Sequence, residues 1–186
     1  MQIHQHEQLA PSAWVRRFAR LIVPGGAVLD LACGEGRHAR YLAGLGCRVE
    51  ALDRDSAALA ALSGVAGVAT HCIDLEQSPW LCAEGSFDGI IVTNYLHRPL
   101  APRLIKALRP GGILIYETFA AGNERLGRPS NPEFLLRKDE LLQWVHGRLQ
   151  VLAFEQGLIG QAKPAVVQRI CAVNRSVEGC RLDSPD

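Results

Sequence analysis

Val28-Leu-Asp-Leu-Ala-Cys-Gly-Glu-Gly-Arg-His-Ala-Arg40 is the stretch of sequence that decides the fold of this chain. It begins with an apolar run that carries an acid, Asp30, near its end, and it continues through the glycines Gly34 and Gly36. The residues that follow, to about position 44, have the apolar spacing of a helix. The stretch therefore predicts a strand, a tight turn and a helix, and such turns bind nucleotide-like ligands on exposed backbone amides.

Two classes of ligand fit this turn. The spacing Gly34-x-Gly36-x-x-Ala39 satisfies the loose dinucleotide pattern, so a nicotinamide or flavin is one interpretation. Asp30 favours S-adenosylmethionine, because a carboxylate before the glycines is poorly placed beside a pyrophosphate and well placed beside an ammonium group. The N–H groups at the start of the helix then donate to the carboxylate of the same ligand. A structural alternative is that Asp30 only caps the turn by accepting backbone N–H groups; we favour ligand contact.

Two further predicted strands also end in acids. One leads into Asp53, about 20 residues after the glycines, where the ribose hydroxyls of a bound adenosine are expected. The other leads into Asp74 and Leu75, which suit the exocyclic amine and the face of an adenine. Each acid alone is compatible with a solvated loop residue. Because the carboxyl ends of parallel strands share one edge of a sheet, the three together predict a single site.

The rest of the chain predicts an α/β fold. Strand-like and helix-like segments alternate, which predicts a parallel sheet with helices on both faces. Near the end, two strand-like segments at 149–155 and 165–173 flank a short glycine-containing connection and predict a hairpin. We therefore expect a doubly wound three-layer sandwich whose seven-stranded, mostly parallel sheet has an antiparallel last strand. The expected strands are 27–31, 48–52, 68–73, 87–93 and 112–118, and the expected helices are 11–21, 35–44, 55–63, 99–108 and 138–146.

Length and composition fit one compact domain. The chain has 186 residues, of which 48% are hydrophobic, and we expect a single domain over 1–175 with a flexible tail at 176–186. The net charge is +1 and no long basic run occurs, so no nucleic-acid partner is expected. No apolar run reaches membrane-spanning length and no signal core is visible, so we expect no membrane partner.

The cysteines and histidines predict no metal site. The six cysteines have no C-x-x-C pair or zinc-like spacing, and most lie in apolar segments. They are typical of small buried side chains in a reducing compartment, so we expect a cytoplasmic location. His4 and His6 lie at a polar end of the chain and are expected to be solvated rather than to bind a metal.

These segments resemble the class I S-adenosylmethionine-dependent methyltransferases, in the family's motif order, from about residue 24 to residue 118. The resemblance rests on Val28 to Gly36, Val49 to Asp53, Ile73-Asp-Leu75, Phe87 to Val92, and the specific Leu108-Arg-Pro-Gly-Gly-Ile-Leu-Ile115 turn and strand. One departure is Ala32, where the family often has glycine. The compact chain and the segment from Phe134 to Leu141 are most similar to the small tellurite-resistance and thiopurine-type members.

The resemblance implies a Rossmann-like methyltransferase fold with S-adenosylmethionine as cofactor. The residues that it assigns to the cofactor are Asp30, Leu31, Ala32, Cys33, Gly34, Gly36, Asp53, Arg54, Asp74, Leu75 and Asn94. Because a sulfonium methyl group is already activated, catalysis needs mainly the positioning of a nucleophile. Few catalytic residues are then required, and no recognisable triad is expected.

Catalytic candidates follow the fourth strand and the fifth. Tyr95 is expected to line the methyl group, or else the core. His97 is a candidate base near neutral pH, although a helix-start residue bonded to backbone is the favoured interpretation. The long polar segment 117–133 is a candidate lid, stiffened by Pro129 and Pro132. In it Arg125 and Arg128, together with Arg98, are candidates to hold an anionic acceptor, or else form a solvated face. Trp14 and Arg17 are expected to close the opposite side.

Three functions are therefore considered. The leading one is methyl transfer to a small-molecule acceptor, possibly a soft or anionic nucleophile. The second is methyl transfer to a protein or RNA at the same cofactor site. The third is a nicotinamide-dependent oxidoreductase or binding protein, which Asp30 and the terminal hairpin disfavour. The oligomeric state stays open.

Overall fold

The protein forms one seven-stranded sheet in a computed structural model that describes residues 10–174. The expected tail at 176–186 and the two N-terminal histidines lie outside these residues. The strands lie in the order β3-β2-β1-β4-β5-β7-β6. Their bounds are β1 Ala27–Leu31, β2 Arg48–Asp53, β3 Val68–Cys72, β4 Phe87–Thr93, β5 Leu108–Phe119, β6 Gln150–Ile159 and β7 Ala165–Val173.

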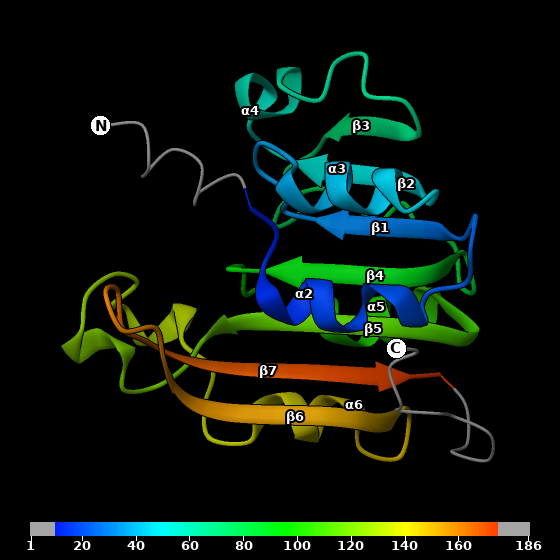
Figure 1. The fold of residues 1–186 in the computed structure, drawn as a ribbon. Coiled ribbons are helices and arrows are strands. Elements are labelled where there is room, and N and C mark those ends of the chain that lie inside the picture. Colours follow the sequence, from blue (N-terminus) through cyan, green and yellow to red (C-terminus); the bar gives the residue numbers. More distant parts are fainter. Residues whose placement is uncertain (1–9, 175–186) are drawn as a thin grey trace.

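The direction of β7 separates this sheet from the common dinucleotide-binding one. Strands β1 to β5 pair in parallel, whereas β7 runs antiparallel to both β5 and β6 (Figure 1). The hairpin therefore inserts a reversed strand between β5 and β6. The usual doubly wound dinucleotide fold has the order 3-2-1-4-5-6 without such an insertion. The predicted seven-stranded sheet with an antiparallel last strand is confirmed.

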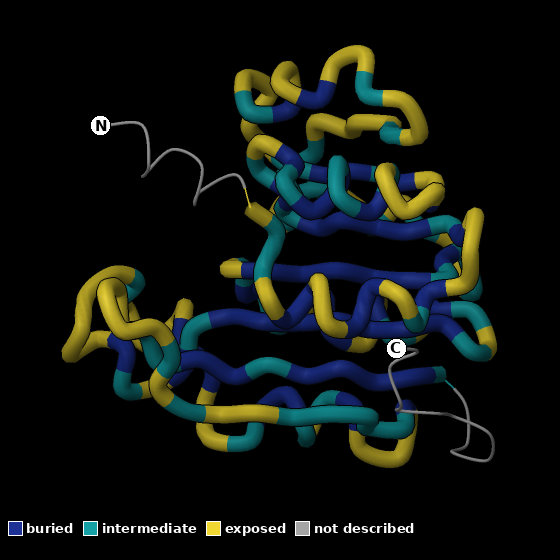
Figure 2. The backbone as a smooth tube through the Cα atoms, viewed as in Figure 1, coloured by how far each residue is buried: buried dark blue, intermediate teal, exposed yellow. Residues whose placement is uncertain are grey.

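Helices cover both faces of this sheet. Their bounds are α2 Ala13–Phe18, α3 Arg37–Gly44, α4 Ser56–Ala60, α5 Ala101–Ala107 and α6 Glu140–Val145, with 3-10 turns η1 Ala19–Leu21, η2 Arg98–Leu100, η3 Asn123–Arg125 and η4 Pro132–Phe134. On one face α2 and α3 bury Trp14 and Leu42 against the sheet. On the other, α5 and α6 bury Leu104 and Leu141. The central strands β1, β4 and β5 are consequently buried on both sides (Figure 2).

The predicted turn before the fifth strand lies inside β5 instead. A turn at Pro110 to Gly112 was expected to precede a strand that starts at residue 112, but β5 starts at Leu108. The reason is a long-range pairing with the end of β7. The Gly111 N–H donates to the Asn174 carbonyl at 2.8 Å, and the Asn174 N–H donates to the Gly112 carbonyl at 2.9 Å. Backbone pairing with a distant segment cannot be read from a local turn pattern.

The other composition-based expectations concern cysteines, metals and membranes. Cys33 and Cys47 are buried, whereas Cys72 is exposed and Cys82 is partly buried, and these four are free thiols. Within residues 10–174 no cluster of three or more His, Cys, Asp or Glu side chains is arranged to hold a metal ion. No helix in that range has the length and apolar character needed to cross a membrane.

Gly36, at the start of α3, generates a test of the fold. It has a φ of +75°, and a Cβ there would lie 2.4 Å from both Cδ atoms of Leu62, which is buried. Gly111 has a φ of +82° but nothing within 4 Å of a Cβ position, so it is a matched control for backbone strain alone. We expect G36A to lower the free energy of unfolding by about 1–3 kcal/mol more than G111A, because overpacking adds to the strain. Urea unfolding of both variants checks this; equal losses would contradict the clash.

Candidate active site

A cavity of about 530 Å³ lies at the carboxyl ends of the parallel strands. It is placed where the strand order reverses between β1 and β4, the position at which open α/β sheets bind ligands. Its volume is in the range of small-molecule and cofactor sites. Of the predicted site residues, those that line it are Ala32, Asp53, Arg54, Asp74, Leu75, Asn94 and Tyr95. Those outside its lining are Asp30, Leu31, Cys33, Gly34, Gly36, His97 and Arg128.

Asp53 joins the glycine turn to the end of β2. Its Oδ2 accepts the Gly34 N–H at 2.8 Å, and its Oδ1 accepts the Asp55 N–H at 3.0 Å. A carboxylate oxygen has two acceptor positions, so each oxygen retains one. Two backbone donors therefore orient a carboxylate on the cavity wall that still has capacity for two hydroxyl donors.

The turn between β1 and α3 has a left-handed backbone at alternate residues. Ala32, Gly34 and Gly36 have φ values of +53°, +54° and +75°. At Gly34 nothing lies within 4 Å of a Cβ position, so its backbone is open to the approach of a ligand. Ala32 holds the same conformation with a side chain, which costs about 1–2 kcal/mol relative to glycine. The departure from the family pattern is thus tolerated, and the turn keeps its shape.

Asp30 is buried beneath this turn, with only 1% of its surface exposed. Burial raises the pKa of its carboxyl group to about 7, against the opposing effects of a hydrogen bond from the Ala39 backbone and the charge of Arg37. Its Oδ2 has no hydrogen-bond partner among the described residues. The carboxyl group therefore both caps the first turn of α3 and keeps one oxygen unpaired. Its contact with a ligand stays a prediction.

Asn94 and Tyr95 line the cavity just after β4. The Asn94 N–H donates to the Glu117 carbonyl at 2.9 Å, and the Tyr95 carbonyl accepts the Tyr116 hydroxyl at 2.8 Å. The Tyr95 hydroxyl is buried and has no partner among residues 10–174. Burial, with the nearby charges of Glu76 and Asp74, raises the pKa of Tyr95 to about 12. Tyr95 is consequently protonated at neutral pH, and its catalytic role stays a prediction.

His97 lies at the start of η2, the position that the favoured interpretation expected, but without the expected hydrogen bond from its side chain to the backbone of the cap. Its backbone carbonyl accepts the Leu100 N–H at 3.0 Å, whereas its side chain makes no capping hydrogen bond. The side chain is partly exposed and is not among those that line the cavity. A role as base stays a prediction that this geometry does not favour.

Arg98 is engaged elsewhere, so its expected role in holding an anionic acceptor is wrong. Its guanidinium donates to both oxygens of Glu140, at 2.7 and 3.0 Å, and to two backbone carbonyls of the segment after β5. Burial alone would raise the pKa of Glu140, but hydrogen bonds from Arg98 and from the Arg137 backbone hold it below its usual value. Arg125 and Arg128 are exposed. Their role toward an anion stays a prediction.

A buried polar network beside the site was missed by the sequence interpretation. Ser12 Oγ donates to Glu117 Oε1 at 2.7 Å, and the Ser12 N–H donates to Nε2 of His38 at 3.1 Å. Arg169 donates to the other Glu117 oxygen at 3.2 Å, and Thr93 Oγ1 lies 3.4 Å from His38 Nδ1. Burial lowers the pKa of His38 to about 3, so the ring is neutral: Nε2 accepts the Ser12 N–H, and Nδ1–H is then the donor toward Thr93 Oγ1. The one local signal was Glu117, a further acid near the end of an apolar strand.

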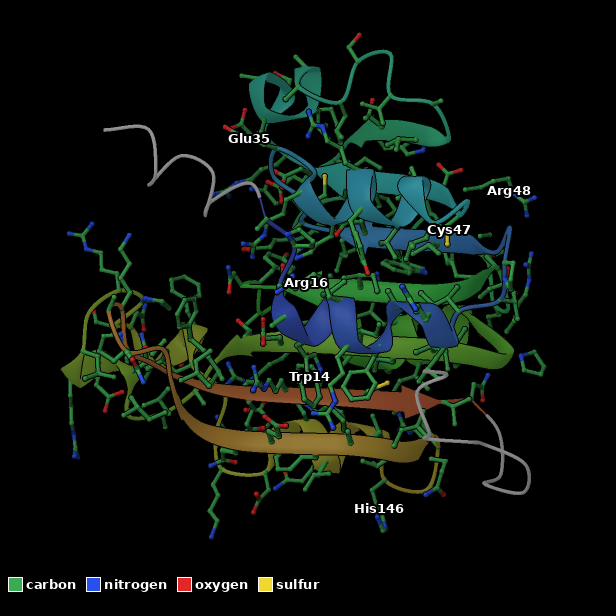
Figure 3. The ribbon with its side chains drawn as sticks, viewed as in Figure 1. Trp14, Arg16, Glu35, Cys47, Arg48 and His146 are labelled. Atoms are coloured by element: carbon green, nitrogen blue, oxygen red, sulfur yellow. The ribbon has the colours of Figure 1, made fainter. Side chains whose placement is uncertain are left out.

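The N-terminal helix does not close the site as expected. Trp14 reaches from α2 to β7, where its Nε1–H donates to the Ile170 carbonyl at 3.2 Å (Figure 3). Arg17 pairs with Glu155 at 3.1 Å, also on the β6–β7 side. Neither Trp14 nor Arg17 lines the cavity. The helix instead fixes the hairpin to the body of the sheet.

The raised pKa of Asp30 generates a pH prediction. Folded Asp30 keeps its proton through the range in which the unfolded side chain has lost it, so its contribution to stability falls as pH rises from about 4 to about 7. Asp30→Asn removes this dependence. The unfolding free energy of the variant minus that of the wild type should rise by up to about 1.4 kcal/mol per pH unit in this window. Denaturant unfolding at several pH values checks this, and a flat difference would contradict it.

The sequence and the fold were compared with known proteins. Residues 28–112 match the family model described as a methyltransferase domain. A protein-L-isoaspartate O-methyltransferase from Chlorobaculum tepidum is 34% identical over 115 residues, 56% of this chain and 50% of that protein. A malonyl-[acyl-carrier protein] O-methyltransferase from Enterobacter lignolyticus is 36% identical over 114 residues, 57% of this chain and 41% of that protein. The chain thus spans half or less of the length of these relatives.

Solved structures share the whole fold. TehB from Haemophilus influenzae superposes with a TM-score of 0.72 at 21% identity, over 88% of this chain and 62% of that one. A 1,6-didemethyltoxoflavin-N1-methyltransferase from Burkholderia thailandensis, solved with its namesake compound and S-adenosylhomocysteine, has a TM-score of 0.66 at 19% identity, over 94% and 82% of the two chains. The predicted fold is confirmed by these superpositions, and the predicted resemblance to S-adenosylmethionine-dependent methyltransferases is supported by the match of residues 28–112 to a methyltransferase domain.

Proposed function

We propose that this protein transfers a methyl group from S-adenosylmethionine to a small-molecule acceptor. The observation that carries the proposal is the meeting of Asp53 and Asp74 in one cavity beside the left-handed turn at residues 32–36. Asp53 ends β2 and Asp74 follows the end of β3, both within the segment that matches a methyltransferase domain. The carboxylates of Asp53 and Asp74 supply hydrogen-bond acceptors for the hydroxyl and amine groups of a nucleoside.

The cofactor's adenosine suits the wall formed by β2 and β3. Asp53 has two free acceptor positions for the ribose hydroxyls. Asp74 accepts the Glu76 N–H at 2.9 Å through Oδ1, which orients its carboxylate for an exocyclic amine, and Leu75 offers an apolar side chain beside it. Arg54 borders the same wall. We assign these residues to the adenosine.

The turn and its surroundings suit the methionyl end. The unpaired Oδ2 of Asp30 is a partner for an ammonium group, and the open backbone at Gly34 lets a carboxylate approach the start of α3. Cys33 supports the turn, since its N–H donates to the Leu52 carbonyl at 3.0 Å and its own carbonyl accepts the Gly36 N–H at 3.0 Å. Burial raises the pKa of the Cys33 thiol to about 12, so it stays neutral. Leu31 and Gly36 have the same supporting role.

Catalysis in this proposal is mainly positioning. The cofactor, when bound, supplies a methyl group already activated on a sulfonium. Tyr95 and Asn94, at the end of β4, border the space through which a nucleophile approaches, and orienting reactants in this way supplies several kcal/mol of the barrier reduction. Because Tyr95 stays protonated, we expect an acceptor that arrives deprotonated or loses its proton to water.

A macromolecular acceptor is the second candidate. The two curated relatives are named for isoaspartate in a protein and for malonyl carried on acyl-carrier protein. The same cofactor wall serves either acceptor. A nicotinamide cofactor is disfavoured, because the strand order and the antiparallel β7 differ from the dinucleotide fold.

Calorimetry with S-adenosylmethionine, S-adenosylhomocysteine and NAD tests the cofactor. We expect binding of the first two and none of NAD; binding of NAD alone would overturn the proposal. A screen of thiols, phenols, amines, chalcogen oxyanions and carboxylated proteins, read out as released S-adenosylhomocysteine, then identifies the acceptor. Turnover only with the proteins would favour the second candidate.

Asp53 generates a quantitative prediction. Asp53→Ala should weaken S-adenosylmethionine binding by about 1–3 kcal/mol, because two hydroxyl partners and the Gly34 contact are lost. Asp55→Ala is the matched control. Asp55 caps α4 by accepting the Ala57 and Ala58 N–H groups but does not line the cavity, so its loss should cost about 1 kcal/mol of stability and leave the affinity unchanged. Calorimetric affinities of both variants check this, and unchanged affinity in Asp53→Ala removes its role.

A further inference from the structure

The acceptor side of the cavity carries a second inference, which rests on the proposed methyl transfer. We propose that the acceptor binds against Phe119, Pro129 and Phe134, here named the acceptor wall, and that it therefore has an aromatic or other apolar body rather than being a bare oxyanion. The wall comes from the end of β5 and the segment that follows it. Arg98, which is paired with Glu140, fixes the backbone of the Phe134 part of this wall.

The charges that line the cavity are all on the cofactor side. They belong to Asp53, Arg54, Asp74 and Glu76, which follow β2 and β3. The side that follows β4 and β5 contributes neutral side chains, among them Tyr95 and the acceptor wall. Once the acids are engaged by the adenosine, the remaining surface is apolar with a few hydroxyl groups. Such a surface recognises a flat apolar body.

The arginines that would suit an oxyanion do not line this side of the cavity. The donors of Arg98 are occupied by Glu140 and by backbone carbonyls, and Arg125 and Arg128 are exposed and outside the cavity lining. Moving a small oxyanion from water onto an apolar surface carries a large desolvation cost without a paired cation. On the side that follows β4 and β5, no arginine or lysine among residues 10–174 lines the cavity to pair with an oxyanion.

Arg98 fixes the backbone on both sides of Phe134. Its guanidinium donates to the carbonyl of Glu133 at 2.8 Å and to that of Leu135 at 2.9 Å, the residues immediately before and after Phe134. Glu140, which is buried, completes the clamp and also accepts the Arg137 N–H at 2.8 Å. A large side chain is thus presented from a rigid backbone.

Phe134 itself is unusual for an apolar side chain. It is 51% exposed although it borders the cavity, so much of its ring is left without protein contacts. Leu126, on the same segment, is 45% exposed but lies outside the cavity lining and serves as a matched control. An exposed aromatic ring at the rim of a cavity, on a backbone that accepts two hydrogen bonds from Arg98, is a contact surface for a ligand.

Binding to the chain saturated with S-adenosylhomocysteine tests the inference. The probes are 2-naphthol and thiophenol as apolar acceptors and selenite as the oxyanion, each measured by calorimetry. We expect the apolar probes to bind and selenite not to bind. Phe134→Ala should weaken 2-naphthol binding about tenfold, while Leu126→Ala and Arg128→Ala leave it unchanged and all three keep the wild-type affinity for S-adenosylhomocysteine.

Arg98→Lys tests the clamp, since lysine keeps the charge and loses the forked contacts. Because Arg98 acts by positioning Phe134, Arg98→Lys should weaken 2-naphthol binding and leave the affinity for S-adenosylhomocysteine unchanged, as Phe134→Ala does. The double variant should bind 2-naphthol only slightly more weakly than Phe134→Ala alone. Selenite binding that Arg128→Ala abolishes, or no binding of either apolar probe, overturns the acceptor wall while leaving the proposed function intact. Failure of the wild type to bind S-adenosylhomocysteine would instead overturn the proposed function.

Discussion

The site depends on one hydrogen bond, from the Gly34 N–H to the carboxylate of Asp53. It connects the turn after β1 with the end of β2, so the two strands present their ligand-facing groups at a fixed distance. The left-handed backbone at Ala32, Gly34 and Gly36 is what points that N–H toward β2. A turn of ordinary backbone geometry would leave the same residues unable to share one wall.

Much of the fold was predictable because its signals are local. Apolar runs, the glycine turn and acids at strand ends are patterns over a few residues, and they predicted that Asp53 and Asp74 meet at one cavity; Asn94, which the resemblance assigned, also lines it. The role of Arg98 was not predictable, because its partner Glu140 lies 42 residues away and no local pattern links them. For the same reason neutral, buried His38 could not be told from the solvated side chains beside it in the glycine stretch.

The cavity therefore has two sides of different character. The charged side chains that line the β2–β3 side suit the adenosine of the proposed cofactor, whereas Phe119 and Phe134 line the β5 side, where the proposed acceptor binds. The match to a methyltransferase domain ends at residue 112, so it includes the residues of the β2–β3 side. Phe119 and Phe134 lie after the end of the match, so the match does not specify the acceptor.

Glu117 links segments that are far apart in sequence. Its side chain joins Ser12 and Arg169, and its backbone carbonyl accepts the Asn94 N–H at 2.9 Å. Removing the N-terminal residues up to and including Ser12 would hence take one hydrogen-bond donor from the buried carboxylate of Glu117, which lies 105 positions later in the sequence. The backbone of Glu117 supports Asn94, which lines the cavity. The choice of where an expressed version of this protein starts is thus also a choice about the shape of its binding cavity.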